Sequence, residues 1–337
     1  MSNESDQNII PSHKFQCESL AQVQYIRISR DDEGQRLDNF LIRHLKKVPK
    51  SRIYNLLRRS EVRINKSRKK AEYKLQTNDI LRLPPVRVES KPKSCTDEAA
   101  NEAFAARLKE WVIYEDNKLL VINKPPSLAV HGGSGIHLGL IELIRRHFQH
   151  AKNWELVHRL DRETSGLIMI AKRRSELRRL HQAFRDNTVH KEYWAILVGD
   201  LKQDKHRVTA PLKKNQLAGG ARIVRVDPTG QDAETLFEVQ GRTPGYTWVL
   251  AKPVTGRTHQ IRVHSQSLGS PILGDDKYTD QSDNAKAKKA GYSGLMLHAR
   301  RLTIPMDDKP NLILTAAPPT NMAKWLENKH NVDPQTF

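Results

Sequence analysis

Hydrophobic residues between positions 34 and 90 follow a helical repeat first and short strand-like runs afterwards. A first helix is predicted from apolar residues spaced three or four apart, namely Leu37, Phe40, Leu41 and Leu45. A second helix is expected to begin near Ser51 and to bury Ile53, Leu56 and Leu57. The runs 62–64 and 80–83 are expected to be short strands. This region is therefore predicted to be an αα-hairpin followed by short strands.

From Trp111 onward, strand-like and helical patterns are mixed along the chain. Strands are expected at 112–114, 119–123, 192–198 and 246–252. One helix is expected around Leu140, Ile141, Ile144 and Phe148, and a second after an N-cap at Ser175. A third helix would run from a cap at Thr258 to a stop at Gly269, with Arg262 near its start. The mixture indicates a larger domain of the α+β class.

The positive charge is concentrated in the first region. The chain has 337 residues, of which 37% are hydrophobic, and this is enough for two compact domains. Its formal net charge is +19, and residues 36–93 carry 18 Lys and Arg against five Asp and Glu. This asymmetry predicts that one small module binds a polyanion, the alternative being a solvated basic surface. The candidate contact residues are Lys46, Lys47, Lys50, Arg52, Arg58, Arg59, Lys66, Arg68, Lys69 and Lys70.

This basic segment resembles the S4 RNA-binding domain. The resemblance rests on QRLDNFLIRHLKKVPKSRIYNLLRRSEVRINK and, further along, KLQTNDILRLP, and it covers most of residues 34–90. It implies that the two helices and the following loop hold structured RNA through phosphate contacts, so the domain would supply affinity more than sequence choice. Such domains accompany several activities, and the resemblance by itself names none.

Composition also sets the expected domain boundaries and compartment. We expect an N-terminal extension at 1–33, the S4-like domain at 34–90, a linker at 91–109, a catalytic domain at 110–325 and a tail at 326–337. The Lys- and Ala-rich stretch 284–291 is expected to be a surface loop. Two cysteines, Cys17 and Cys95, supply neither a disulfide framework nor a thiolate metal site. With no Sec-type signal or membrane-spanning apolar run, the expected location is cytoplasmic.

The most informative stretch for chemistry runs from Leu156 to Ala171. Two apolar strand-like pieces flank a polar turn that contains Asp161. A carboxylate on a rigid turn between strands can be aimed into a cleft as a nucleophile or base. The alternative is that Asp161, close to Thr164 and Ser165, caps the turn through Asx-type hydrogen bonds.

Four segments in order decide between these alternatives. HRLDRETSG at 158–166, HKEYWAIL at 190–197, KPVTGRTHQIRVHSQSLGSPILGD at 252–275 and LMLHARRL at 295–302 resemble the RluA family of pseudouridine synthases over nearly all of 110–320. The resemblance implies a mixed, mainly antiparallel sheet with flanking helices. It also implies isomerisation of uridines in large-subunit ribosomal RNA: the C1′–N1 bond breaks, the uracil rotates, and C1′ joins C5. No atom is gained or lost overall, so no cofactor or metal is expected.

The resemblance also implies roles for four residues. Asp161 matches the essential carboxylate, acting either by attack on carbon or as a base on the ribose. Arg159 matches the arginine that fills the gap left by the flipped base, the alternative being a surface arginine on phosphate. Tyr193 matches the tyrosine that stacks on uracil, the alternative being packing beside Trp194. Arg262 matches the basic partner that favours an ionised aspartate, the alternative being an ordinary salt bridge.

Other readings of the residues are weaker. His259 and His264 are five residues apart, unlike a metal-binding pair on one helical face, and are interpreted as RNA-contacting or structural. His158 and His298 are interpreted as scaffold. A glycosidase needs a second matched carboxylate, and only Glu163 is near Asp161 in sequence. The remaining alternative is a non-enzymatic ribosome assembly or RNA-binding factor, which the S4-like half would support alone.

Overall fold

The computed structural model places the chain in two compact units, Met1–Asp97 and Glu98–Phe337. It describes residues 9–12, 15, 22–45, 48, 50–86, 104, 106–132, 139–216, 222–306 and 309–332. Cys17, Cys95, Lys46 and Lys47 lie outside the described residues. Each unit is considered by itself.

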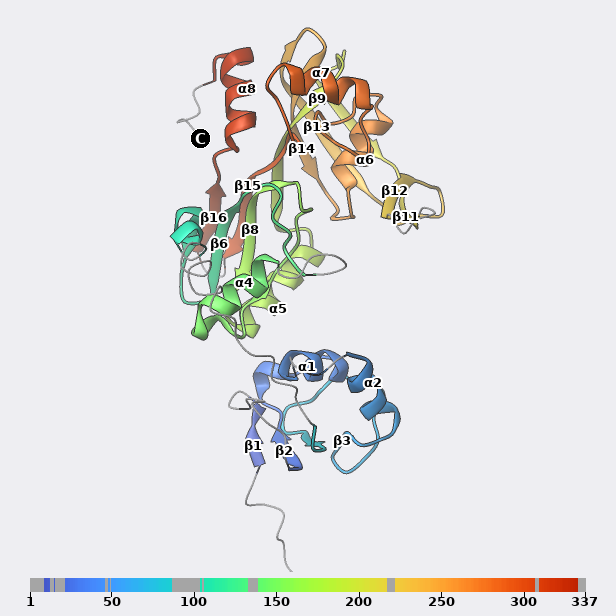
Figure 1. The fold of residues 1–337 in the computed structure, drawn as a ribbon, viewed down its shortest axis with the longest axis vertical. Coiled ribbons are helices and arrows are strands. Elements are labelled where there is room, and N and C mark those ends of the chain that lie inside the picture. The colour runs from blue at the N-terminus through green and yellow to red at the C-terminus, as the bar shows by residue number, and fades with distance from the viewer. Residues whose placement is uncertain are drawn as a thin grey trace, which may run out of the picture. The chain divides into compact units, whose positions relative to one another are not determined.

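The first unit packs two helices against a small sheet (Figure 1). The helices are α1 (Leu37–His44) and α2 (Lys50–Arg58). The four-stranded sheet has the order β1-β2-β4-β3, from β1 (Ile9–Pro11), β2 (Gln24–Arg27), β3 (Arg63–Ile64) and β4 (Ile80–Leu83). All its pairs are antiparallel except β1 with β2. The two helices and two strands predicted from the hydrophobic repeat are confirmed.

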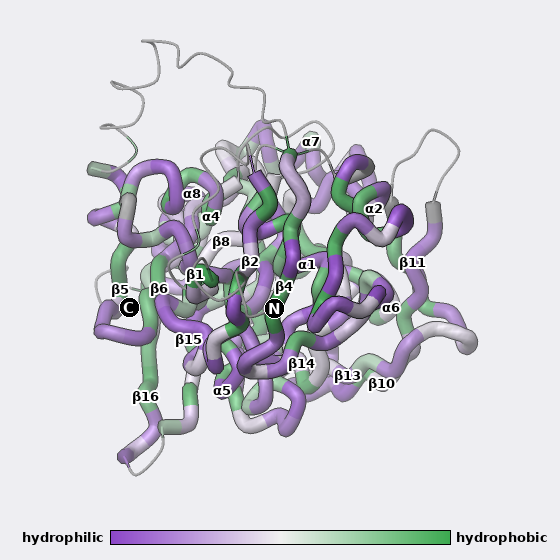
Figure 2. Tube along the Cα trace, turned by 90° about the horizontal axis from the view of Figure 1, so that it is seen from below, coloured by the Kyte–Doolittle hydropathy of each residue, from purple (hydrophilic) through white to green (hydrophobic). Residues whose placement is uncertain are grey.

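Apolar faces of both helices form the core of this unit. Phe40 of α1 and Leu56 of α2 are fully buried in one hydrophobic cluster with Leu81 of β4. Figure 2 shows α2 as a coil on which hydrophobic and hydrophilic segments alternate. The apolar residues spaced three or four apart therefore lie on the one side of each helix that faces the core, as their spacing predicted.

The first unit begins earlier in the chain than the sequence suggested. β2 pairs with β4 in register from Gln24 opposite Leu83, and both Phe15 and Ile26 are buried in the core cluster. The boundary predicted at residue 34 is therefore too late. The run that contains Ile26 is short and its partner strand lies more than fifty positions away in sequence, so no local repeat marks it.

The second unit is built on a ten-stranded sheet of order β10-β13-β14-β9-β15-β8-β6-β5, with β16 paired to β15 and β7 to β8. Its pairs are antiparallel except β15 with β8, so the expected mixed, mainly antiparallel sheet is confirmed. The strands are β5 (Val112–Glu115), β6 (Leu119–Lys124), β7 (Glu155–Leu156), β8 (Ser165–Ala171), β9 (His190–Val198), β10 (Lys205–Thr209), β13 (Glu234–Thr243), β14 (Tyr246–Pro253), β15 (Leu297–Met306) and β16 (Lys309–Thr315). A separate hairpin pairs β11 (Leu212–Gln216) with β12 (Arg222–Val226).

Helices cover both faces of this sheet (Figure 1). They are α4 (Leu140–His147), α5 (Arg174–Arg185), α6 (Gln260–Ser267), α7 (Gln281–Lys289) and α8 (Thr320–His330). Ile168 of β8 belongs to the same cluster as Ile144 of α4, whereas its neighbour Met169 clusters with Leu180 of α5. Because successive strand residues face opposite sides, α4 and α5 lie on opposite faces of β8.

The ends of several helices differ from the expected ones. α5 begins at Arg174 after an extended Arg173, so Ser175 lies inside the helix and does not cap it. α6 begins at Gln260, and its N-cap is His259 in a left-handed conformation, so Thr258 is not the cap. Apolar spacing identifies a helix but leaves its first residue open, because caps depend on the backbone conformation just before the helix.

Three further expectations are corrected by burial. The stretch 284–291 is largely the helix α7, in which Ala287 is buried, and is not a loop. Leu108 is buried in the second unit's core, so the expected linker ends before it. The expected boundary at 325 falls inside α8, where both Trp325 and Leu326 are fully buried. In each case a few apolar residues within a polar segment were enough to anchor it.

Candidate active site

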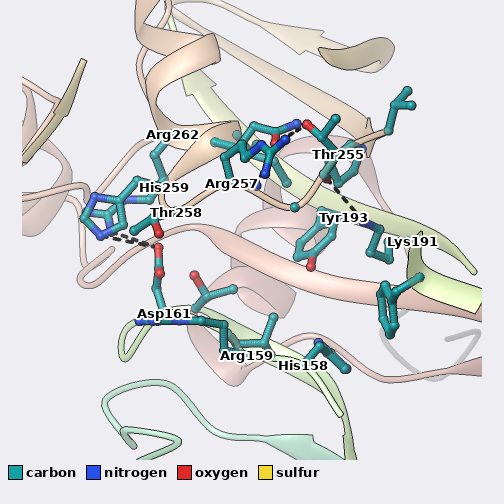
Figure 3. Close-up of a pocket in the computed structure, with 18 of the residues that line it drawn as sticks. His158, Arg159, Asp161, Lys191, Tyr193, Thr255, Arg257, Thr258, His259 and Arg262 are labelled. Carbon is teal, nitrogen blue, oxygen red and sulfur yellow. Dashed lines mark hydrogen bonds and ion pairs between the residues drawn. The ribbon is translucent and has the colours of Figure 1, made fainter. Parts of the chain in front are cut away.

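A pocket of about 410 Å³ lies in the second unit, and residues from several distant parts of the chain line it (Figure 3). The turn after β7 contributes Arg159 and Asp161, β9 contributes Tyr193, and α6 contributes Arg262. These are the four residues selected from the sequence. They are separated by up to 103 positions in the chain, and the sheet brings them together.

The turn that carries Asp161 is held on both sides. β7 and β8 pair on either side of the turn, and Thr164 N–H donates to the carbonyl of Asp161 at 3.2 Å. Gly166, the second residue of β8, has a φ of +109°, and a Cβ there would lie 2.3 Å from the carbonyl oxygen of Ala299 in β15. Only glycine fits this close approach, so it is what allows β15 to pack against the base of the turn.

A buried lysine ties the same turn to the neighbouring strand. The Nζ of Lys124 donates to the carbonyl oxygens of Pro125, Leu128 and Arg162 at 2.8–3.0 Å. Burial lowers the pKa of Lys124 to about 7, while the charges of Glu163 and Asp161 act in the opposite direction. The hydrogen bond to the carbonyl of Arg162 holds the residue that follows Asp161 in place.

Asp161 shares one arginine with a second carboxylate. Arg262 Nη1 donates to Asp161 Oδ2 at 3.2 Å, while its Nε and Nη2 make a bidentate pair with Asp275 at 2.7 and 2.8 Å. Arg262 and Asp275 are buried, whereas Asp161 remains partly exposed. The Asp161 side chain therefore points to α6, and no hydrogen bond from a backbone N–H of its own turn to its carboxylate occurs among the described residues.

The electrostatics of this cluster favour a permanently charged arginine. Burial acts to lower the pKa of Arg262, but the hydrogen bonds and charge of Asp275, helped by Asp161, outweigh it and raise the pKa. Asp275 is fixed in turn, because the backbone N–H groups of Lys277 and Tyr278 donate to it. The pocket thus has a preorganised positive group on one side of Asp161.

His259 is a second neighbour of Asp161. Its Nε2 lies 3.7 Å from Asp161 Oδ2, and its Nδ1 lies 2.7 Å from the hydroxyl of Tyr278. Burial lowers the pKa of His259 to about 4, although the charge of Asp161 opposes this. Figure 3 shows the Asp161 carboxylate pointing toward His259 and Arg262. The ring is therefore neutral near pH 7.

Tyr193 faces the pocket from the middle of the sheet. In β9 it pairs with Ala251 of β14 and Ala299 of β15, and its neighbour Trp194 is buried in the main core. The ring of Tyr193 lies across the pocket from Asp161 in Figure 3. Burial raises the pKa of Tyr193, and the negative charge of Asp161 adds to the effect. The hydroxyl is therefore protonated at neutral pH.

Arg159 differs from the other three residues because it is exposed at the pocket. Across the described residues, its side chain has no hydrogen-bond or ion-pair partner. Lys191, deeper in the pocket, donates to the carbonyl of Thr255 at 3.2 Å, and burial lowers its pKa to about 8. Arg159 is thus an exposed arginine at the pocket whose side chain has no partner among the described residues.

The remaining histidines named from the sequence have structural surroundings. His158 accepts a hydrogen bond from the N–H of Met169, and His298 lies 3.0 Å from the hydroxyl of Ser165. His264 is fully buried against the hydroxyl of Thr235 and the carbonyl of Ala210. Within the described ranges, no group of three or more His, Cys, Asp or Glu is arranged to hold a metal ion.

Most of the basic residues selected in the first unit are exposed. They are Arg52, Arg58, Arg59, Lys66, Arg68 and Lys70. Lys69 is half-buried with its ammonium 4.9 Å from the centre of the Tyr73 ring. Lys50 lies at the start of α2. Lys66 sits at the tip of a tight turn, where Ile64 and Ser67 exchange backbone hydrogen bonds.

Two neighbours of this cluster were not among the catalytic or substrate-binding residues selected from the sequence. Asp275 is the last residue of the third quoted segment, and His259 lies within the same segment, three positions before Arg262. The position of Asp275 at the end of a motif segment could have marked its carboxylate as a candidate site residue. The position of His259 depends on its left-handed backbone conformation, with φ at 52°, which sequence does not reveal.

The second unit is of the α+β class, and its pocket holds one partly exposed carboxylate, Asp161, beside a buried arginine and across from a tyrosine. The profile of the family described as RNA pseudouridylate synthase matches residues 118–267. Ribosomal large subunit pseudouridine synthase C from Haemophilus ducreyi is 49% identical over 282 residues, covering 84% of this chain and 88% of that protein. The protein of the same name from Pasteurella multocida is 47% identical, covering 87% of this chain and 94% of that protein.

A solved structure agrees with these sequence matches. Human RNA Pseudouridylate Synthase Domain Containing 4 is 29% identical, with a TM-score of 0.56, over 68% of this chain and 97% of that chain. The chain belongs to the RNA pseudouridylate synthase family, a class of isomerases, as its motifs predicted. No helix within the described residues is both long and apolar enough to span a membrane.

Proposed function

We propose that this protein isomerises specific uridines of large-subunit (23S) ribosomal RNA to pseudouridine. Its relatives from two bacteria carry names that state this substrate, and they match along most of their length. The observation that carries the proposal is the Asp161 carboxylate, held through Oδ2 by Arg262 at the pocket. Within the described part of the chain, Oδ1 has no hydrogen-bond donor and is therefore the oxygen available to the substrate.

Asp161 supplies the carboxylate that opens the C1′–N1 bond, either by attack on carbon or by removing a proton from the ribose. Arg262 stabilises the ionised carboxylate of Asp161. Because Arg262 holds Oδ2, the other oxygen, Oδ1, is left to face the substrate. Tyr193 stacks on the detached uracil and keeps it in the pocket while it rotates.

Arg159 enters the space that the target uridine leaves when it flips out of the RNA. Base flipping costs a few kcal/mol because stacking is lost, and a planar guanidinium offsets part of that cost. The exposure of Arg159 and its lack of a partner in the described structure support this role.

The first unit is an S4-like domain that anchors the RNA. Its α1–α2 pair, the tight turn at Asn65–Lys66 and the exposed basic residues support this proposal. Phosphate contacts of this kind position an RNA without reading its bases. A cytoplasmic location follows from the proposed substrate, because bacterial ribosomes are assembled there.

The reaction can be tested with large-subunit RNA transcribed with [5-³H]UTP. Formation of the C1′–C5 bond expels the tritium from C5 into water, so the amount of tritium released measures the amount of pseudouridine formed. We expect release from large-subunit RNA and none from small-subunit RNA of equal label. Tight binding without release would instead make the protein a non-enzymatic assembly or RNA-binding factor.

A further inference from the structure

The hydroxyl of Tyr278 lies between the backbone of Val224 and the ring of His259. The backbone N–H of Val224 donates to this hydroxyl at 3.0 Å. The single hydrogen of the hydroxyl is then available for His259 Nδ1, 2.7 Å away. Because a neutral imidazole has one N–H, its proton must be on Nε2 when Nδ1 accepts. Nε2 is the nitrogen that faces Asp161.

The ring of His259 is held from several directions. It meets the Tyr278 ring edge-on, with centroids 5.6 Å apart, and its backbone is left-handed, a conformation that is uncommon among residues other than glycine. Tyr278 is buried, and the Arg262 guanidinium lies 5.1 Å from the centre of its ring. The charged groups around His259 are Asp161, Arg262, Lys277 and Asp275. Strain and packing of this kind are maintained where a side chain must keep one orientation.

We propose that His259 is a positioning residue for Asp161, and that Tyr278 orients it by fixing its Nε2–H tautomer. This inference rests on the proposed function. The present 3.7 Å separation is longer than a hydrogen bond, and it would shorten to hydrogen-bond length when RNA fills the pocket. Arg262 and His259 then both donate to Oδ2, so Oδ1 keeps one direction, toward the ribose.

The activity test uses two substitutions of similar size at the same backbone position. His259→Gln places an amide N–H close to the position of Nε2–H, whereas His259→Leu removes the donor. A hydrogen bond to a charged group predicts that His259→Leu slows single-turnover conversion about ten- to hundredfold, with RNA affinity changed less than about threefold. His259→Gln should recover most of the rate. Equal losses in the two variants, or no loss in either, would overturn the proposal.

The pH dependence of the rate separates positioning from proton transfer. A neutral donor contributes equally across pH 6–8, so His259→Gln should leave the shape of the wild-type profile unchanged. Disappearance of one limb of the profile in His259→Gln would show that the imidazole titrates in the reaction, and the positioning role would be wrong.

The tautomer can be measured without any RNA. In protein with ¹⁵N-labelled histidine, the His259 signals are assigned as those missing from His259→Gln. We expect a neutral ring protonated at Nε2 in the wild type, and a mixture with the Nδ1–H form in Tyr278→Phe. A wild-type ring protonated at Nδ1 would refute the proposal. This result stands even if no RNA is converted, so failure of the proposed function is distinguishable from failure of this inference.

Discussion

The charges of the pocket and those of the first unit are organised in opposite ways. In the pocket, Arg262 is buried and bonded to two carboxylates, and Asp161 points in one direction. On the first unit, residues such as Arg59, Lys66 and Lys70 extend into solvent. Fixed partners suit a group that must act on one atom, whereas loose exposed charges suit contact with a phosphate backbone of varied shape. The two regions should therefore fail separately when they are altered.

The largest effect is expected from Asp161→Asn. This change keeps the shape of the side chain but removes the charge, so conversion should fall by more than about 10⁴-fold while RNA affinity stays nearly constant. Tritium release and filter binding measure the two quantities. Glu163→Gln, on the same turn, is the control and should retain activity. A parallel loss of affinity in Asp161→Asn would contradict the separation of the regions.

Asp275→Asn tests whether the buried side of Arg262 supports the pocket. Removing the charge of Asp275 leaves the buried positive charge of Arg262 without its bidentate partner, so the free energy of unfolding should fall by about 3 kcal/mol. Conversion should also fall, since Arg262 is then free to shift from Asp161. Urea unfolding followed by fluorescence gives the stability. The neighbouring exposed Asp276→Asn is the control, and equal stability of the two variants would refute the role of Asp275.

Acid should destabilise the second unit through two histidines whose pKa values are lowered in the fold. Burial lowers the pKa of His158 to about 3 and that of His298 to about 4. In the unfolded chain both rings bind a proton below about pH 6.5, whereas in the fold they stay neutral. The unfolded state therefore binds more protons in this window, and stability falls from pH 7 to pH 5 by roughly 1–2 kcal/mol per histidine.

Tryptophan fluorescence measures this effect selectively, because all five tryptophans lie beyond residue 98, in the second unit. His158→Asn retains an acceptor for the Met169 N–H but does not titrate in this range. It should therefore reduce the pH dependence, and an unchanged dependence would show that other groups cause the acid sensitivity.

The smallest effect is expected from the double change Lys66→Gln and Lys70→Gln. Each lost phosphate contact should reduce the slope of log affinity against log salt by roughly 0.7–0.9, with conversion of saturating RNA unchanged. Filter binding at several salt concentrations measures the slope. The same charge change at exposed Lys324 and Lys329 in α8 is the control. An equal effect there would show that the first unit does not contribute more to RNA binding than other basic residues do.

The sequence predicted those parts of the molecule that local patterns encode. The spacing of Phe40 and Leu56 identified two helices, and the quoted motifs selected Asp161, Tyr193 and Arg262, which the fold brings to one pocket. Contacts across long sequence separations were missed. The strand at Ile26 joins a sheet whose partner is distant, and Asp275 gains its role only because α6 packs beside it. Backbone conformation at single residues, as at His259, has no local pattern at all.

If the protein converts uridines in large-subunit ribosomal RNA with the Asp161 carboxylate, cells that lack this gene should lose specific pseudouridines. We would map pseudouridine by carbodiimide labelling in such cells, complemented with either the wild-type copy or Asp161→Asn. Specific large-subunit positions should lose their label in the deletion strain, and only the wild-type copy should restore them. An unchanged map in the deletion strain, or restoration by Asp161→Asn, would contradict this proposal.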